Sequence, residues 1–274
     1  MNALGAAPVP RSPSVTGPGA FTAETLAQFG RWMHHLKREP FNIMFTLVQP
    51  VLWMLFFSSL MQNARFPGER LKDVPYRDFM TAGVLAFTVY GNAMAGGIPM
   101  LFDRENGFLT RLLAAPISRA SILVGRFLYV ELLAMAQTLV ILGLAVLMGV
   151  RVQTGFPGIL GILVYGGLLG LGLTALSLAL AFILKRHGSF FMILGTVGLP
   201  LLFCSTALAP LEAMPPWMRV VALCNPMSYC VNAMRELVLG GGTVWSFLLN
   251  AAGLLAFDVV AVWLTVRALS RKLG

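Results

Sequence analysis

The chain has 274 residues, of which 57% are hydrophobic and only 11% are charged. Soluble globular domains carry about 25% charged residues, so this composition excludes a water-soluble body and predicts an integral membrane protein. Lysine and arginine number 20 against 11 aspartates and glutamates, and the three cysteines are too few for a disulfide scaffold. The positions of the basic residues decide whether the positive charge serves membrane topology or a nucleic acid.

Residues 1–20 are rich in Ala, Pro, Gly and Ser, and we expect them to form a disordered tail. After the tail, apolar side chains recur at helical spacing with basic side chains between them: Leu26, Phe29, Met33 and Leu36. This pattern predicts an amphipathic helix over residues 22–38, with Thr22 as its N-cap, lying on the membrane surface.

A bilayer core requires about 20 apolar residues in one helix, and six stretches of the chain meet this requirement. They cover residues 41–61, 79–101, 127–150, 157–184, 189–209 and 247–266. We therefore predict an all-α membrane protein in which a single domain, residues 21–274, crosses the membrane six times. Thirteen of the 20 basic residues then fall on the side of both termini, which the positive-inside rule assigns to the cytoplasm. The positive charge is a topology signal, and we expect no nucleic-acid partner.

The sequence lacks the signatures of several kinds of catalytic site. None of the four lysines follows a glycine, so the chain has no P-loop to bind nucleotide phosphates. The three histidines and three cysteines show no metal-ligand spacing, and no Gly-x-Ser-x-Gly elbow occurs. We therefore expect neither catalysis nor a resident cofactor or metal on this chain.

Two carboxylates fall inside predicted spans, Glu131 near the start of the third and Asp258 in the middle of the sixth. A carboxylate within the bilayer is costly, so each is a candidate functional residue. The alternative is that each pairs with a neighbouring helix, or that Glu131 reaches the interface. Two isolated acids make a poor proton relay, and the chain shows no clear internal repeat of the kind expected in secondary transporters.

The segment 103–126 lies on the inner side, between the second and third predicted spans. Its charges and apolar edge predict a short cytoplasmic helix that ends at Pro116 and couples a cytoplasmic partner to the spans. An ordinary interfacial loop helix is the alternative. The residues to which we assign coupling are Arg104, Glu105, Gly107, Arg111, Leu112, Leu113 and Pro116.

The segment 215–242 lies on the outer side, between the fifth and sixth predicted spans. Two prolines predict the start of a short helix, Asn225-Pro226 predicts a turn, and apolar residues at helical spacing predict a second helix. The segment is too polar to span and too apolar to stand free in water, so we predict a re-entrant helix pair in the outer leaflet. An ordinary amphipathic outer loop is the alternative.

This outer pair is our candidate for a gate. We expect Arg235 and Glu236 on its polar face, at the aqueous rim or beside polar partners, and Met234 packed against spans five and six. The gate residues are Trp217, Asn225, Pro226, Tyr229, Met234, Arg235 and Glu236.

Three groups of motifs resemble the type-2 permease family of ABC transporters over roughly residues 26–269. The outer one is Pro-x-Trp, then Asn225-Pro226-Met227-Ser228-Tyr229, Arg235 and Gly240-Gly241. Glu105-Asn106-Gly107 and Pro116-Ile117-Ser118 are similar to the family's inner helix, although Phe108 departs from its common acid–Gly–Thr continuation. Lys37-Arg38-Glu39-Pro40, followed by Gln49-Pro50, is similar to the drug-resistance branch.

The resemblance implies six spans per subunit, two permease subunits (identical or different), and two separate ATP-binding subunits that carry ATP and Mg²⁺. Closure of those ATPases would press on residues 104–116 and 22–38, and the outer pair would seal the exit. We expect an exporter of hydrophobic drug-like or lipid-like substrates, surrounded by membrane lipid in a bacterial-type inner or plasma membrane. Two alternatives stay open: a polysaccharide or lipid-linked glycan exporter of the same fold, and an ion-coupled secondary transporter that uses Glu131 and Asp258.

Overall fold

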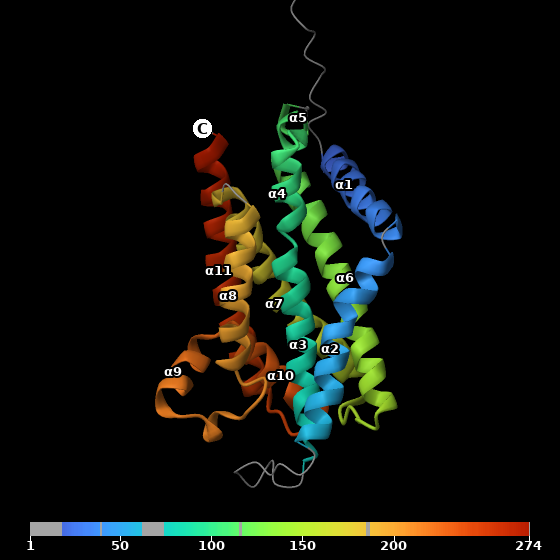
Figure 1. The fold of residues 1–274 in the computed structure, drawn as a ribbon, viewed down its shortest axis with the longest axis vertical. Helices are drawn as coiled ribbons and strands as arrows, with labels where there is room; N and C mark the ends of the chain where they lie inside the picture. The colour runs from blue at the N-terminus through green and yellow to red at the C-terminus, as the bar shows by residue number, and fades with distance from the viewer. Residues whose placement is uncertain (1–17, 39, 62–73, 115–116, 185–186, 274) are drawn as a thin grey trace, which may run out of the picture.

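The computed structural model describes residues 18–38, 40–61, 74–114, 117–184 and 187–273. The regular elements in these ranges are all helical: α1 (Pro18–Arg38), α2 (Pro40–Leu60), α3 (Tyr76–Ala95), α4 (Ile98–Glu105), α5 (Phe108–Ala114), α6 (Arg119–Leu147), α7 (Gly155–Ile183), α8 (His187–Phe203), a 3-10 turn η1 (Leu211–Ala213), α9 (Pro216–Cys224), α10 (Pro226–Leu239) and α11 (Val244–Leu273). The long helices form an elongated bundle (Figure 1). Helices α1 and α5 and the end of α11 lie at one end, which we call the inner end, and α9 and α10 lie at the other, the outer end.

Four helical segments among the described residues are long and apolar enough to cross a membrane. They are Tyr76–Glu105, Ala120–Leu147, Gly155–Ile183 and Val244–Ala268, which match the second, third, fourth and sixth predicted spans. The other two predicted spans correspond to α2 and α8, whose apolar stretches Thr46–Leu60 and His187–Phe203 are shorter. The chain is therefore an all-helical protein with four clear candidate spans.

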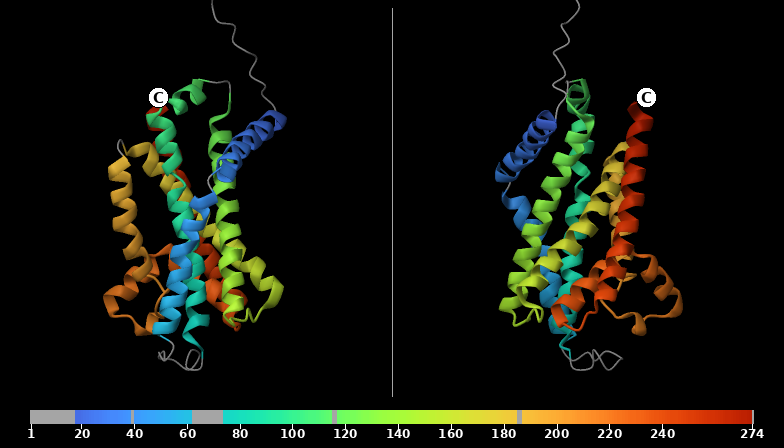
Figure 2. Two further views of the ribbon diagram at one scale, coloured as in Figure 1. Left: turned by 45° about the vertical axis from the view of Figure 1, so that its right-hand side comes forward. Right: turned by 180° about the vertical axis from the view of Figure 1, so that it is seen from behind.

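Helix α1 lies obliquely across the inner end and packs against α6 (Figure 2). It begins at Pro18, so the last residues of the predicted tail are helical, and Thr22 bonds to the carbonyl of Gly19 from within the helix (3.0 Å) instead of capping it. The contact with α6 depends on the absence of a side chain at Gly125, because a Cβ atom there would lie only 2.7 Å from the side chain of Gln28.

The second span is interrupted, whereas the apolar run predicted one continuous helix. Helix α3 ends at Ala95 and α4 begins at Ile98, and the break between them docks on Ser177 of α7. The hydroxyl of Ser177 accepts a hydrogen bond from the Gly97 amide (2.9 Å) and donates one to the carbonyl of Met94 (2.5 Å). Backbone groups freed inside an apolar bundle need partners, and Ser177 supplies both.

Helix α7 is the centre of the bundle and contacts α3, α4, α6, α10 and α11. Two buried apolar clusters surround it. The larger includes Phe79, Leu85, Ile141 and Met234, and the smaller, at the inner end, includes Met100, Leu101, Phe182 and Phe190.

Candidate functional site

The inner segment forms an elbow, not the single helix that we predicted. Helix α4 ends at Glu105, Asn106 and Gly107 turn the chain, and α5 starts at Phe108. Gly107 has φ of 68°, in the left-handed region that glycine adopts without a steric penalty. We call α4, this turn and α5 the elbow. The glycine of the Glu-x-Gly motif is therefore the residue that allows the chain to bend.

Arg104 attaches the elbow to the inner end of α7. Its guanidinium donates hydrogen bonds to the carbonyls of Ala181 (2.7 Å) and Phe182 (3.3 Å), and also to that of Leu184. These carbonyls belong to the last turn of α7, where a positive charge is favoured by unpaired backbone acceptors and by the helix dipole. Arg104 thus caps the C-terminus of a spanning helix.

Glu105 and α1 add further ties to the elbow. His187 Nδ1, at the start of α8, lies 2.6 Å from Oε2 of Glu105. From α1, Arg31 forms an ion pair with Asp103 (2.9 Å) and places its guanidinium 4.7 Å from the ring centre of Phe108. The elbow is consequently connected to α1, α7 and α8 together.

The remaining coupling candidates differ in what they face. Arg111 is exposed on α5, whereas Leu112 packs against the smaller apolar cluster. The apolar edge that we expected to meet a partner is thus used within the chain at Leu112. Leu113 belongs to α5, and Pro116 lies outside the described residues.

The outer segment contains two helices, α9 and α10, joined at Asn225. Asn225 Oδ1 accepts a hydrogen bond from the Met227 amide (3.0 Å) and so caps α10, whose first residue is Pro226. Its Nδ2 donates to the carbonyls of Leu201 (2.7 Å) and Cys204 (3.0 Å) at the end of α8. One side chain therefore caps α10 and fixes it to α8.

The two outer helices differ in burial. On α9, Trp217 is 64% exposed and Val220 63% exposed, so this helix presents an apolar surface to its surroundings. Helix α10 is buried against α3, α7 and α11. Tyr229 joins the two helices, since its hydroxyl donates to the carbonyl of Leu223 (2.8 Å).

Arg235 is buried, so of our two alternatives it lies beside polar partners and not at the aqueous rim. Its Nη2 donates to the carbonyl of Thr206 (2.6 Å), its Nε donates to that of Phe79 (3.3 Å), and the guanidinium lies 3.7 Å from the ring centre of Phe79. Position 235 follows Val231 by four residues, so it shares the buried face of α10. Glu236, in contrast, accepts a hydrogen bond from the hydroxyl of Ser246.

Met234 is fully buried, but it packs against different spans from those predicted. Its terminal methyl lies beside Gly166 of α7 and near Val89 of α3, which are the fourth and second spans. We expected spans five and six. Helix α10 as a whole does contact the predicted spans. It meets α11, the sixth span, through Tyr229 and Gly253, and its Arg235 bonds to Thr206, which lies within the predicted fifth span.

Glu131 and Asp258 both lie against glycines of α7. A Cβ atom at Gly170 would lie 2.5 Å from Oε1 of Glu131, and one at Gly172 would collide with Oδ1 of Asp258. Neither acid forms an ion pair with the described residues. Two residues along a helix are about 200° apart around its axis, so the acids approach α7 from different sides.

The sequence of the chain is similar to those of known transport proteins. The profile of the family described as ABC-2 type transporter matches residues 25–239. The transport permease ycf38 of Pyropia yezoensis is 34% identical over 267 residues, which are 92% of this chain and 90% of that protein. The doxorubicin resistance ABC transporter permease protein DrrC of Mycobacterium tuberculosis is 28% identical over 229 residues, 81% of this chain and 79% of that protein. The daunorubicin resistance ABC transporter permease protein DrrB1 of Streptomyces coeruleorubidus is 29% identical over 244 residues, 85% of this chain and 82% of that protein. The family that the motifs predicted is confirmed, and the chain belongs to the ABC-2 type transporter family.

Proposed function

We propose that the chain is a six-span permease subunit of an ABC exporter that moves a hydrophobic or amphiphilic substrate outward. Helices α2 and α8 complete the six spans, and both termini face the cytoplasm of a bacterial-type plasma membrane. ATP is hydrolysed on separate subunits at the inner end, and two permease subunits form the pathway. The names of two relatives, which refer to doxorubicin and daunorubicin resistance, favour an amphiphilic substrate.

The connection of the elbow to the bundle is the observation that carries this proposal. Arg104 holds the end of α7, and Asp103 holds α1 through Arg31. A displacement of α5 by a cytoplasmic ATPase would reach two helices through these contacts. The exposed side chain of Arg111 is on the part of the elbow that is free for such a partner.

The proposal is tested by co-purifying the chain with a candidate ATP-binding subunit from the same organism and reconstituting both into liposomes. We expect accumulation of a fluorescent amphiphilic dye that requires ATP and persists when a protonophore removes the proton gradient. Dye movement that needs no ATP, stops with the protonophore, and is lost in Glu131→Gln or Asp258→Asn would instead establish the ion-coupled transporter. ATP-dependent movement of a lipid-linked glycan, with no movement of dye, would establish the glycan exporter.

A further inference from the structure

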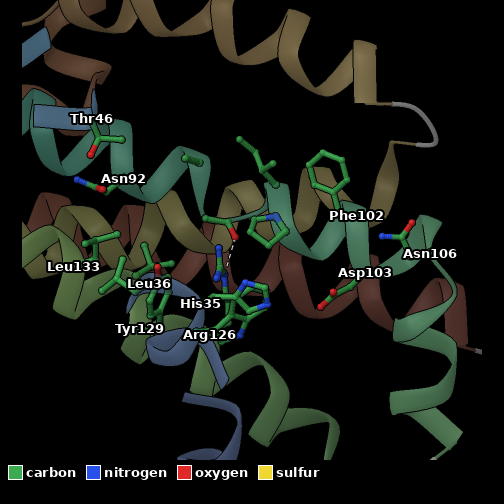
Figure 3. Close-up of a pocket in the computed structure, with 16 residues that line it drawn as sticks. His35, Leu36, Thr46, Asn92, Phe102, Asp103, Asn106, Arg126, Tyr129 and Leu133 are labelled. Carbon is green, nitrogen blue, oxygen red and sulfur yellow. Dashed lines mark hydrogen bonds between the residues drawn. The ribbon is translucent and has the colours of Figure 1, made fainter. Parts of the chain in front are cut away.

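A cavity of about 560 Å³ lies among α1, α2, α3, α4 and α6, toward the inner end. Helix α6 contributes Arg126, and α1 contributes Trp32 and His35. Figure 3 shows Arg126 and His35 in the middle of this cavity, with Asp103 toward the elbow and Leu133 on the opposite side. The cavity thus places charged side chains beside apolar ones.

Arg126 is only 3% exposed, which is unusual for a charged side chain in an apolar bundle. Nε is the one nitrogen of its guanidinium with a hydrogen-bond partner among the described residues, the carbonyl of Gly96 at 2.9 Å. Nη1 is buried without such a partner. The guanidinium also lies 4.1 Å from the ring centre of Trp32 and 5.1 Å from that of Tyr129. Aromatic faces stabilise a cation, but they leave its N–H donors unused.

The acid in the cavity does not neutralise Arg126. Asp103 is paired with Arg31 (2.9 Å), and Arg126 forms no ion pair with any described residue. His35 and Tyr129 are the other titratable side chains that line the cavity, and neither brings a carboxylate to it. The wall of the cavity therefore carries one uncompensated positive charge with a free donor. A guanidinium in this state favours a phosphate or carboxylate as its partner.

Apolar side chains of the same cavity continue away from the charge. Leu36 and Leu133 line it beyond Arg126, in the direction of Thr46 on α2 (Figure 3), and Val130 also belongs to its wall. An anionic group beside Arg126 could extend a hydrocarbon chain along these residues. This arrangement fits an amphiphile better than a small inorganic anion.

We propose that this cavity binds the anionic head group, a phosphate or a carboxylate, of an amphiphile that enters from the inner side of the membrane. Arg126 donates hydrogen bonds to the anion, Trp32 and Tyr129 hold the guanidinium, and the apolar wall accepts the first part of the tail. The ligand is either a lipid of the membrane or a single-chain amphiphile. Binding requires no ATP-binding subunit, so this proposal stands or falls separately from the transport function.

Quenching of Trp32 fluorescence tests the proposal, because Trp32 lies directly against Arg126. The purified chain is placed in phosphatidylcholine nanodiscs that contain a small fraction of phosphatidylglycerol with brominated tails, or of brominated phosphatidylcholine as the neutral comparison. The signal from Trp32 is the part that disappears in Trp32→Phe. We expect it to be quenched more strongly by the anionic lipid, and we expect Arg126→Gln to weaken this preference about tenfold to a hundredfold.

Lys37→Gln is the matched control for the charge of the membrane surface. It removes one positive charge from the same helix as Trp32, but Lys37 is exposed and lies outside the cavity wall. This variant should keep the preference for the anionic lipid. A loss as large as that in Arg126→Gln would mean that the preference is a surface effect, and the proposal would be wrong.

A competition experiment on the unchanged protein avoids variants that fold poorly. Dodecyl phosphate should displace the brominated phosphatidylglycerol, whereas inorganic phosphate at the same concentration should not. Displacement at micromolar dodecyl phosphate identifies a single-chain amphiphile as the ligand, and displacement only by excess unbrominated phosphatidylglycerol identifies a bilayer lipid. Equal quenching by the anionic and neutral lipids, with no effect of any competitor, would overturn the proposal.

Discussion

Two glycines on α3 provide a controlled test of how the outer end is packed. A Cβ atom at Gly83 would lie 2.5 Å from the carbonyl oxygen of Ala207 and 3.0 Å from its Cα. A Cβ atom at Gly91, two turns further along the same helix, would meet nothing within 4 Å. Gly83→Ala and Gly91→Ala therefore make the same chemical change on one helix, with a collision in only one of them.

The expected free energies follow from these distances. The obstacle at Gly83 is backbone, which cannot rotate away as the end of a side chain can. Helix α3 and the segment around Ala207 must therefore separate by about 0.5–1 Å. Overpacking of this kind costs about 1–3 kcal/mol. Replacing glycine by alanine in a helix gains up to about 1 kcal/mol. The gain in helix propensity is common to both variants, so their free energies of unfolding should differ by the overpacking cost, about 1–3 kcal/mol.

Heating the detergent-purified variants and following the fraction that stays monodisperse measures this difference. We expect the midpoint of Gly83→Ala to lie roughly 3–10 °C below that of Gly91→Ala. Because Thr206, the neighbour of Ala207, holds Arg235, export per folded molecule should also fall in Gly83→Ala. Equal midpoints and equal export would refute the packing of this segment on α3, and with it our account of the buried Arg235.

Three further predictions concern the elbow, the outer pair and the topology. Arg104→Gln should keep the ATPase bound but reduce dye export per ATP hydrolysed, since about 2 kcal/mol of contacts with the end of α7 are lost. Arg111→Gln should instead weaken co-purification of the ATPase. The reverse pattern would contradict both roles. Met234→Asp should place a charge at a fully buried position and abolish export at a cost of several kcal/mol, which normal transport by a correctly inserted variant would disprove. In a cysteine-free background, an impermeant thiol reagent added outside should label Glu212→Cys and not Ala114→Cys, whereas the opposite labelling would invert the membrane orientation.

The helices could be predicted from the sequence because the bilayer fixes their minimum length. A run of about 20 apolar residues has few other uses, so the apolar stretches located α6, α7 and α11 to within a few residues at most boundaries. Local chemistry also sufficed at Asn225-Pro226, since an N-cap followed by proline starts a helix wherever it occurs. These features depend on residues close together in the chain.

Features that depend on distant residues could not be predicted in the same way. The break in the second span needs Ser177, which is 80 residues from Gly97. The burial of Arg235 depends on the carbonyl of Thr206 and on the ring of Phe79, neither of which the periodicity of α10 reveals. Arg126 gave one signal beyond its place in the charge count: it stands directly before the predicted third span, with no acidic residue one turn away on either side.

Helix α7 can be regarded as a strut that joins the two ends of the molecule. Its 29 residues extend about 43 Å. Arg104 holds its inner end, and at its outer end the hydroxyl of Thr154 (2.6 Å) and the amide of Gln153 (2.9 Å) donate to the carbonyls of Leu237 and Val238 in the last turn of α10. A strut that tilts about its middle moves its two ends in opposite directions. Closure at the elbow and opening beside α10 would then be a single rigid movement, with no intermediate in which both ends are open.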